Sequence, residues 1–88
     1  MREKLNDPVS VVMYYSAKQR LFRPHMLHWQ KRDYAIGEIG FHHQIRDGRV
    51  LHHIFECVDD KHTLAFRLNF NTELLSWTLE AVSDGEAA

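Results

Sequence analysis

The stretch at residues 64–82, LAFRLNFNTELLSWTLEAV, decides the fold class. Apolar and polar residues alternate in two runs, and the turn-forming residues 71–74 lie between them. A period of two places every large apolar side chain on one face of a β-hairpin, as a sheet with one buried side requires. With a four-residue loop, the expected opposed pairs are Phe70–Leu75, Leu68–Trp77 and Phe66–Leu79.

Turn-forming residues divide the rest of the chain into similar short runs. Pro8, Pro24 and the pair Asp47-Gly48 mark three of the boundaries. No segment keeps a helical apolar spacing for long enough to indicate a helix. We therefore predict six strands, at residues 9–16, 26–30, 34–44, 50–58, 63–70 and 75–82. Residues 1–7 and 84–88 are expected to fray, because they have little to bury.

The run at residues 50–58 has apolar side chains on both faces, as in a strand that is covered on two sides or strongly coiled. Gly37 and Gly40 in the preceding run suit the bends that barrel closure needs. We expect an all-β fold: a single small antiparallel meander of about six strands, half-open or closed into a barrel. An open sheet that dimerises through its uncovered face is the alternative.

Composition sets wide limits on the kind of protein. A chain of 88 residues with 44% hydrophobic residues and a net charge of −1 fits one globular domain, residues 1–88. The single cysteine, Cys57, excludes an internal disulfide framework. The apolar runs are shorter than the roughly 18 residues of a membrane helix, and the N-terminus lacks a signal-type apolar stretch. We expect a cytoplasmic protein.

Seven histidines are the unusual feature of the composition. Asp47-Gly48 is a strong signal for a two-residue hairpin loop. That loop would place His43 opposite His52 and His42 opposite His53, with one pair on each face of the hairpin. Opposed Cβ atoms lie about 4.5–5.5 Å apart, so either pair could share a metal ion.

A metal site on His42, His43, His52 or His53 needs a third ligand. The local spacing places none; the nearest candidates in the sequence are Glu38, Cys57, His28 and His62. The alternative is that the histidines are ordinary strand residues, one pair half-buried and the other solvated. We predict no cofactor, because no phosphate-binding loop, dinucleotide fingerprint or metalloprotease motif is present.

The basic residues concentrate in the first half of the chain. Residues 1–49 hold nine Lys and Arg against five Asp and Glu, and residues 50–88 hold two against seven. Basic loops with interleaved aromatic residues on a small barrel are typical of single-stranded nucleic-acid binders. The candidate residues for such a site are Lys18, Arg20, Arg23, Trp29, Lys31, Arg32 and Tyr34. A solvated surface of mixed charge is the alternative.

The sequence contains no arrangement typical of a catalytic centre. Cys57 lies within a predicted strand, and no serine lies in a nucleophile elbow. We predict a non-enzymatic interaction module whose partner is another protein or a second copy of the chain, with no membrane partner. A single-stranded nucleic-acid binder is the second hypothesis, and a protein that binds metal through paired histidines is the third.

Three motifs resemble a family of small uncharacterised bacterial β domains. They are the segment from Pro24 through Trp29 to Tyr34, the Phe66-Arg67-Leu68 motif, and a closing Trp77-Thr78-Leu79 motif. The resemblance covers residues 24–84 and departs at Gln30-Lys31, where the family more often has Gly. It implies a small β-sheet fold, and it assigns no activity and no catalytic residue.

Overall fold

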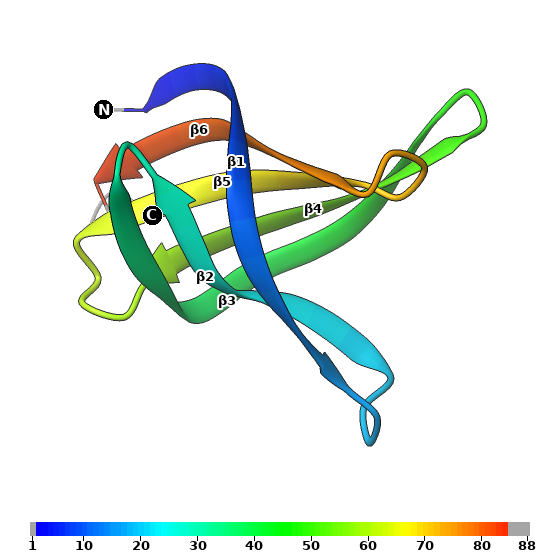
Figure 1. Ribbon diagram of the computed structural model, residues 1–88, viewed down its shortest axis with the longest axis horizontal. Helices are drawn as coiled ribbons and strands as arrows, with labels where there is room; N and C mark the ends of the chain where they lie inside the picture. The colour runs from blue at the N-terminus through cyan, green and yellow to red at the C-terminus, as the bar shows by residue number, and fades with distance from the viewer. Residues whose placement is uncertain (1, 85–88) are drawn as a thin grey trace.

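The computed structural model describes residues 2–84, and these form six strands joined by short turns. The prediction of an all-β chain is confirmed (Figure 1). The strands are β1 (Glu3–Ser16), β2 (Leu21–Trp29), β3 (Arg32–Asp47), β4 (Val50–Asp59), β5 (Leu64–Asn71) and β6 (Ser76–Asp84).

Each strand pairs antiparallel with the next one along the chain, and β1 pairs with β6 to close the ring. The predicted meander is therefore a closed barrel, and not the open sheet that was the alternative. The ladders between neighbouring strands differ in length, however. The β2–β3 ladder has only four residue pairs, from Met26–Ala35 to Trp29–Arg32, whereas β4 and β5 pair along seven.

Two long, bent strands carry the chain around the barrel. The start of β1 pairs with β6 as far as Val9, and its residues 10–16 pair with β2. Likewise, residues 32–35 of β3 pair with β2, and from Ile36 onward β3 pairs with β4. The barrel is therefore made of two sheets that share β1 and β3, as the bends of these strands in Figure 1 show.

Gly37 lies at the bend in β3. The register between β3 and β4 shifts between Ile36 and Ile39. A Cβ at Gly37 would lie 3.0 Å from the Asp59 carbonyl oxygen. The two backbones can approach this closely only because Gly37 has no side chain. A second shift lies between Ile39 and Phe41, beside Gly40, where a Cβ would make an ordinary 3.6 Å contact. The bends expected at both glycines are confirmed.

The barrel interior is filled by the apolar residues that alternate along the strands. Phe55, Leu27, Leu68 and Leu79 are essentially inaccessible to solvent. Trp77 stacks at a tilt on Phe70 and Phe55, with ring centroids 4.9 and 5.7 Å apart. The face assignment of the last hairpin is confirmed, because its predicted apolar residues in β5 and β6 line this core.

The predicted register of that hairpin is wrong by two residues. Phe70 lies opposite Trp77 and Leu68 opposite Leu79, and a bulge after Arg67 then sets Phe66 opposite Val82. Leu75 belongs to the turn, with a positive φ of 56°, and is highly exposed. Because the shift of Phe70 and Leu68 is an even number of residues, the side chains of β5 and β6 that pair there keep their predicted faces, whereas Leu75 does not.

Several strand boundaries also differ from the prediction. β1 begins at Glu3, and Glu3 and Lys4 pair with β6, so this segment is not frayed as expected. β2 begins at Leu21 and runs through Pro24, which lies at a bulge next to Met13, where a proline is tolerated. Asp84 ends β6, and the other residues predicted to fray, 1 and 85–88, lie outside the described part of the chain.

Candidate interaction surface

The β1–β2 hairpin extends beyond the barrel and forms an arm at the lower right of Figure 1. We define the arm as residues 10–16 of β1, the turn at residues 17–20 and residues 21–25 of β2. The Arg20 amide donates to the Ser16 carbonyl oxygen at 2.7 Å and closes the turn. Five large apolar side chains on the arm are exposed: Val12 (59%), Met13 (41%), Tyr14 (58%), Tyr15 (60%) and Leu21 (55%).

The arm is exposed because the two strands that flank the β1–β2 pair in the barrel, β6 and β3, do not continue along it. β6 begins at Ser76 and pairs with β1 only as far as Val9, and β2 pairs with β3 only from Met26 onward. Within residues 2–84, no strand lies beside residues 10–16 on the side away from β2, and from Met13 to Arg23 the arm is a two-stranded ribbon without a third strand on either edge. Such a ribbon cannot bury its side chains by itself, so apolar residues on it remain in water.

Phe22 and Arg23 join the arm to the barrel. The Phe22 ring makes edge contacts with His53, Phe55 and Phe70, with centroids 4.8 to 5.5 Å away, and so closes the barrel end where β2 leaves β3. The Arg23 guanidinium donates to the carbonyl oxygens of Ile36 (3.2 Å) and Gly37 (2.8 Å). Arg23 thereby bridges the gap between β2 and β3.

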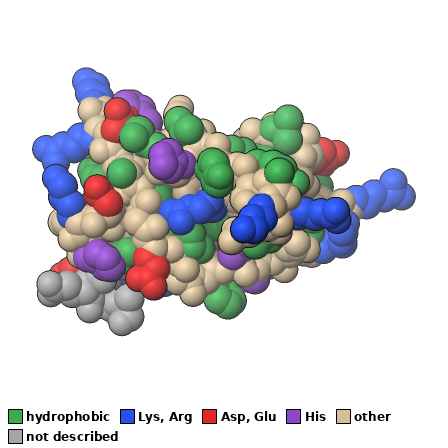
Figure 2. Space-filling view, turned by 90° about the horizontal axis from the view of Figure 1, so that it is seen from below, with side chains coloured by type: hydrophobic (Ala, Val, Ile, Leu, Met, Phe, Trp, Pro, Cys, Tyr) green, Lys and Arg blue, Asp and Glu red, His purple; other side chains and the backbone are tan. Residues whose placement is uncertain are grey.

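The basic residues predicted to bind nucleic acid do not form one patch. Lys18 and Arg20 lie in the turn of the arm, whereas Lys31 and Arg32 lie at the other end of β2. The nine residues of β2, about 26 Å of extended chain, separate the two groups. The face toward which the arm points carries hydrophobic and basic side chains, and its acidic side chains lie mostly toward one end (Figure 2).

Trp29 and Tyr34 pack at the opposite end of the barrel from the turn of the arm. Both rings contact Phe66, with centroids 6.4 and 5.5 Å away, and Trp29 Nε1 donates to Asp7 Oδ2 at 3.2 Å. These two half-buried rings support the core, and the exposed aromatic side chains of the arm are Tyr14 and Tyr15. Local sequence does not distinguish the two pairs of rings, since all four residues lie in runs that read as strands.

The β3–β4 hairpin also has a register two residues from the predicted one. Asp47 lies opposite Val50, so the loop is Gly48-Arg49, with a positive φ at Gly48 only, the φ signature of a type II′ turn. His52 lies opposite Ile45, and His53 lies opposite Gln44. The directly opposed histidine pairs are therefore not formed.

Because the shift is two residues, each histidine pair still shares a face of the hairpin, and the rings of one pair meet. His42 Nε2 and His53 Nδ1 lie 2.9 Å apart as diagonal neighbours, and one nitrogen donates to the other. Burial lowers the pKa of both rings, and repulsion from a neighbouring histidine lowers each further. Both imidazoles therefore resist protonation near neutral pH.

The other two histidines have different neighbours. His43 stacks at a tilt on Phe41, 4.6 Å between centroids, and its Nδ1 is buried without a hydrogen-bond partner. His52 Nδ1 donates to Asn69 Oδ1 at 2.9 Å. Among residues 2–84 no cluster of three His, Cys, Asp or Glu side chains is arranged to hold a metal ion. The metal hypothesis therefore still lacks its third ligand.

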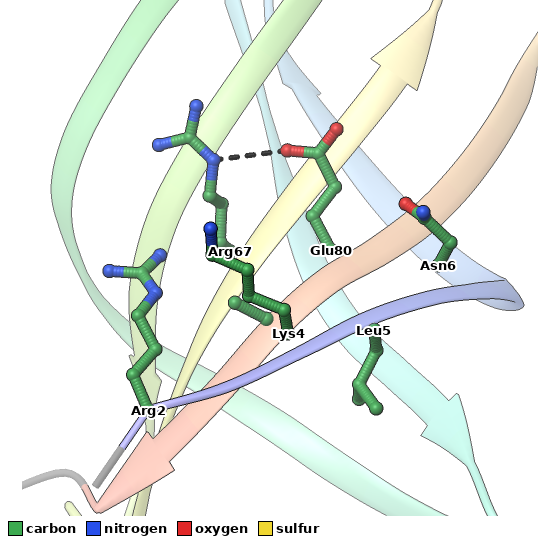
Figure 3. A pocket seen from close by; sticks show the side chains of 7 residues that line it. Arg2, Lys4, Leu5, Asn6, Arg67 and Glu80 are labelled. Atoms are coloured by element: carbon green, nitrogen blue, oxygen red, sulfur yellow. Dashed lines mark hydrogen bonds and ion pairs between the residues drawn. The ribbon is translucent and has the colours of Figure 1, made fainter.

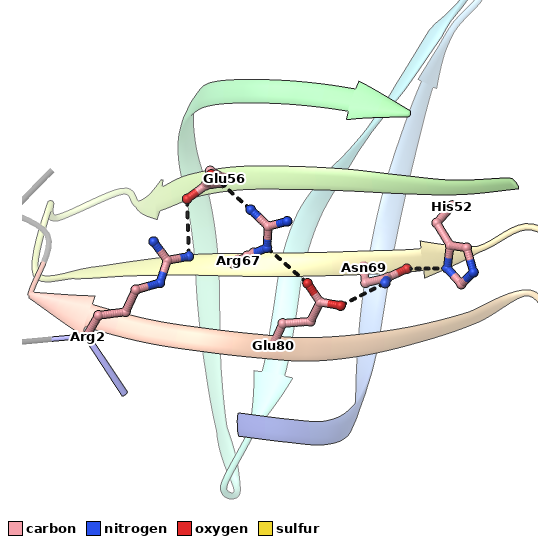
Figure 4. Close-up of polar contacts among 6 residues, drawn as sticks. All are labelled: Arg2, His52, Glu56, Arg67, Asn69 and Glu80. Carbon is pink, nitrogen blue, oxygen red and sulfur yellow. Dashed lines mark hydrogen bonds and ion pairs between the residues drawn. The ribbon is translucent and has the colours of Figure 1, made fainter. Parts of the chain in front are cut away.

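The outer face of the barrel carries a polar network next to a shallow groove. Arg67 contacts Glu80 at 3.0 Å and Glu56 at 3.2 Å, and Glu56 also pairs with Arg2 (Figure 4). Asn69 Nδ2 donates to Glu80 and links the network to His52.

The groove between the start of β1 and strands β5 and β6 is lined in part by Arg2, Lys4, Arg67 and Glu80 (Figure 3). Glu80 in the groove and Glu56 beside it thus offset two of the three positive charges that Arg2, Lys4 and Arg67 bring to the groove.

Cys57 is a core residue. It is 4% exposed, and burial raises the pKa of its thiol to about 12, so the nucleophilic thiolate is essentially absent at neutral pH. Asp59 is also buried, and its Oδ1 accepts hydrogen bonds from the amides of Thr63 and Leu64. This carboxylate holds the β4–β5 turn in place.

Comparison with known protein families, curated proteins and solved structures found no match for this chain. The resemblance to the small bacterial β domains stays a prediction. In the part of the chain that the structure describes, no helix is long and apolar enough to span a membrane.

Proposed function

We propose that this chain is a non-enzymatic interaction module of the bacterial cytoplasm and that it binds a partner protein through the arm. The observation that supports this proposal is the exposure of five large apolar side chains close together on the arm: Val12, Tyr14 and Leu21 on one face, and Met13 and Tyr15 on the other. Clustered apolar exposure of this kind marks interaction sites, whereas scattered single residues are ordinary. Two of the five are tyrosines, a residue type that is enriched at protein interfaces.

Site-specific cross-linking tests this proposal. A photoreactive phenylalanine analogue replaces Tyr15 on the arm, and the same analogue at Leu74, a still more exposed residue of the β5–β6 turn, is the control. In the native cells, light should join the Tyr15 variant to one identifiable protein that the Leu74 variant does not capture. Equal adducts at the two positions, or none at Tyr15, would reject the arm as the binding surface.

A second candidate function, binding of single-stranded nucleic acid, is favoured by one observation. Tyr14 and Tyr15 are exposed on the same arm as Lys18 and Arg20, and bases stack on such rings while cations contact the phosphates. Replacing Lys18 and Arg20 with Gln should then weaken oligonucleotide binding and flatten its salt dependence. A labelled oligonucleotide whose anisotropy stays constant with added protein at about 50 mM salt would remove this candidate.

A further inference from the structure

We infer that the free edge of β1 on the arm binds an extended, acidic and apolar segment of the partner as an added strand. This inference rests on the proposed function, and it adds the chemistry and the backbone geometry of the partner. It follows from three properties of the arm: an unpaired strand edge, a charge of one sign, and aliphatic as well as aromatic side chains.

The unpaired edge comes from the different lengths of the strands. β6 lies beside β1 up to the pair Val9–Trp77 and begins one residue earlier, at Ser76. Within the described residues, no strand continues beside residues 10–16 on that side, while β2 pairs with them on the other. An edge of this length can take a partner strand of about seven residues through backbone hydrogen bonds.

The other free edge of the arm is less suited to a partner. On β2, Arg23 reaches across the gap to the Ile36 and Gly37 carbonyl oxygens, and Phe22 packs into the barrel end. An added strand there would have to displace both side chains. Among residues 2–84, no comparable side-chain contact crosses the β1 edge, so it is the edge that the geometry favours.

The positive charge of the arm favours a partner segment with acidic side chains. From Pro8 to Arg32 the chain contains five Lys and Arg residues and no Asp or Glu. Lys18 and Arg20 lie in the turn at the end of the β1 edge. Charges of opposite sign across an interface favour the right partner and penalise a wrong one, so acidic side chains fit this edge and basic ones do not. Two copies pairing by this edge would bring two basic arms together, which disfavours a homodimer.

The exposed aliphatic side chains favour a peptide over a nucleic acid as the partner of the arm. Val12, Met13 and Leu21 are aliphatic and exposed beside the two tyrosines. Nucleotide bases stack on aromatic rings but do not cover aliphatic side chains in the same way. Val12 and Tyr14 share one face of β1, and alternate side chains of an added peptide strand point to that face, where apolar ones can pack beside Val12.

Synthetic peptides test the inference directly. The probe is a labelled peptide of about ten residues that alternates Val or Leu with Glu, and the control probe has Lys in place of Glu. Fluorescence anisotropy should show the Glu peptide binding the protein about ten-fold more tightly than the Lys peptide at low salt. Lys18→Glu with Arg20→Glu should reverse this preference, while Lys31→Glu with Arg32→Glu, at the far end of β2, should leave it unchanged.

Backbone methylation separates strand addition from simple surface contact. In an added strand only every second amide faces β1, so N-methylation of one alternate set should abolish binding, and methylation of the other set should be tolerated. Equal binding of the Glu and Lys peptides, or equal effects of the two methylated sets, would overturn the inference. So would a Tyr15 adduct with a second copy of the chain or with a nucleic acid.

The two proposals fail in different ways. If Tyr15 cross-links to a protein but that protein contributes a helix or a basic segment, the arm binds a partner and the strand-addition inference is wrong. If Tyr15 gives no specific adduct, the proposed function itself is wrong. A Tyr15 adduct that maps to an extended acidic segment supports both.

Discussion

The β4–β6 sheet and the β1–β2 arm are both antiparallel and rich in aromatic residues. They differ in the number of neighbouring strands. β5 has a full ladder on each edge, and its Phe66, Leu68 and Phe70 are buried. The arm has a single ladder, and its Tyr14 and Tyr15 are exposed. Burial is thus determined by the number of neighbouring strands as well as by the residue types. Side chains in the barrel provide stability, and side chains on the arm are free to contact a partner.

The largest expected effect comes from removing a core ring. Trp77→Ala should lower the free energy of unfolding by about 3–5 kcal/mol, because the cavity would lie between Phe55 and Phe70. A domain has only about 5–15 kcal/mol in total, so the variant should be largely unfolded on modest heating. Thermal unfolding followed by circular dichroism measures this. A melting temperature close to that of the parent would contradict the core assignment.

The two glycines of β3 give a matched pair. Gly37→Ala should destabilise the protein by about 1–3 kcal/mol, because the new methyl group would lie 3.0 Å from backbone atoms of Asp59 and Asp60, which cannot move aside easily. Gly40→Ala meets its nearest atom at 3.6 Å and should change stability far less. Urea unfolding of the two variants makes the comparison. Equal losses would show that the close approach at Gly37 is not what requires the glycine.

The histidine contact at the barrel end should make the protein sensitive to acid. The pKa values of His42 and His53 lie below 6.5 in the folded chain, so below about pH 6.5 the unfolded chain binds more protons than the folded one. Their contribution to stability is therefore complete above that pH and is lost as the pH falls toward the folded pKa values.

Urea midpoints measured between about pH 7.5 and 5.5 check this dependence. The midpoint of the parent should fall over this range, and a variant with His42→Gln and His53→Gln should lose less, since glutamine does not titrate. Parallel curves for the two proteins would show that other groups cause the acid sensitivity.

The smallest expected effect on stability belongs to the arm. Tyr14→Ser with Tyr15→Ser removes two rings that are already in water, so the free energy of unfolding should change by no more than about 0.5 kcal/mol per site. The same variant should lose the partner adduct formed from a photoreactive group at Leu21. A large fall in melting temperature would mean that the tyrosines support the fold.

The period-two patterns predicted the faces of the strands correctly, but local sequence did not fix their registers. Both hairpin registers were wrong by two residues, because turn residues decide the offset: Leu75 adopts a left-handed conformation, and the second loop is Gly48-Arg49. Neither choice is visible in the alternation itself. The diagonal contact of His42 with His53 followed from their shared face alone.

The candidate site was harder to predict, because exposure depends on which strands end early. Tyr14 and Tyr15 resemble core strand residues, and only the ends of the β1–β6 and β2–β3 ladders show that they lie outside. Conversely, the charge of Arg23 alone predicts a role in nucleic-acid binding, whereas its guanidinium donates to carbonyl oxygens across the β2–β3 gap. Contacts between residues distant in the sequence determine both outcomes.

Amide hydrogen exchange of the free protein measures directly whether the edge of β1 away from β2 is unpaired along residues 10–16, as the ladders of the described residues indicate. In an edge strand, amides that face the neighbour are hydrogen-bonded and alternate ones face water. Residues 10–16 should therefore alternate between protected and rapidly exchanging amides, while β5, paired on both sides, should be protected along its length. Uniform protection of residues 10–16 would show that this edge is already occupied and would contradict the account.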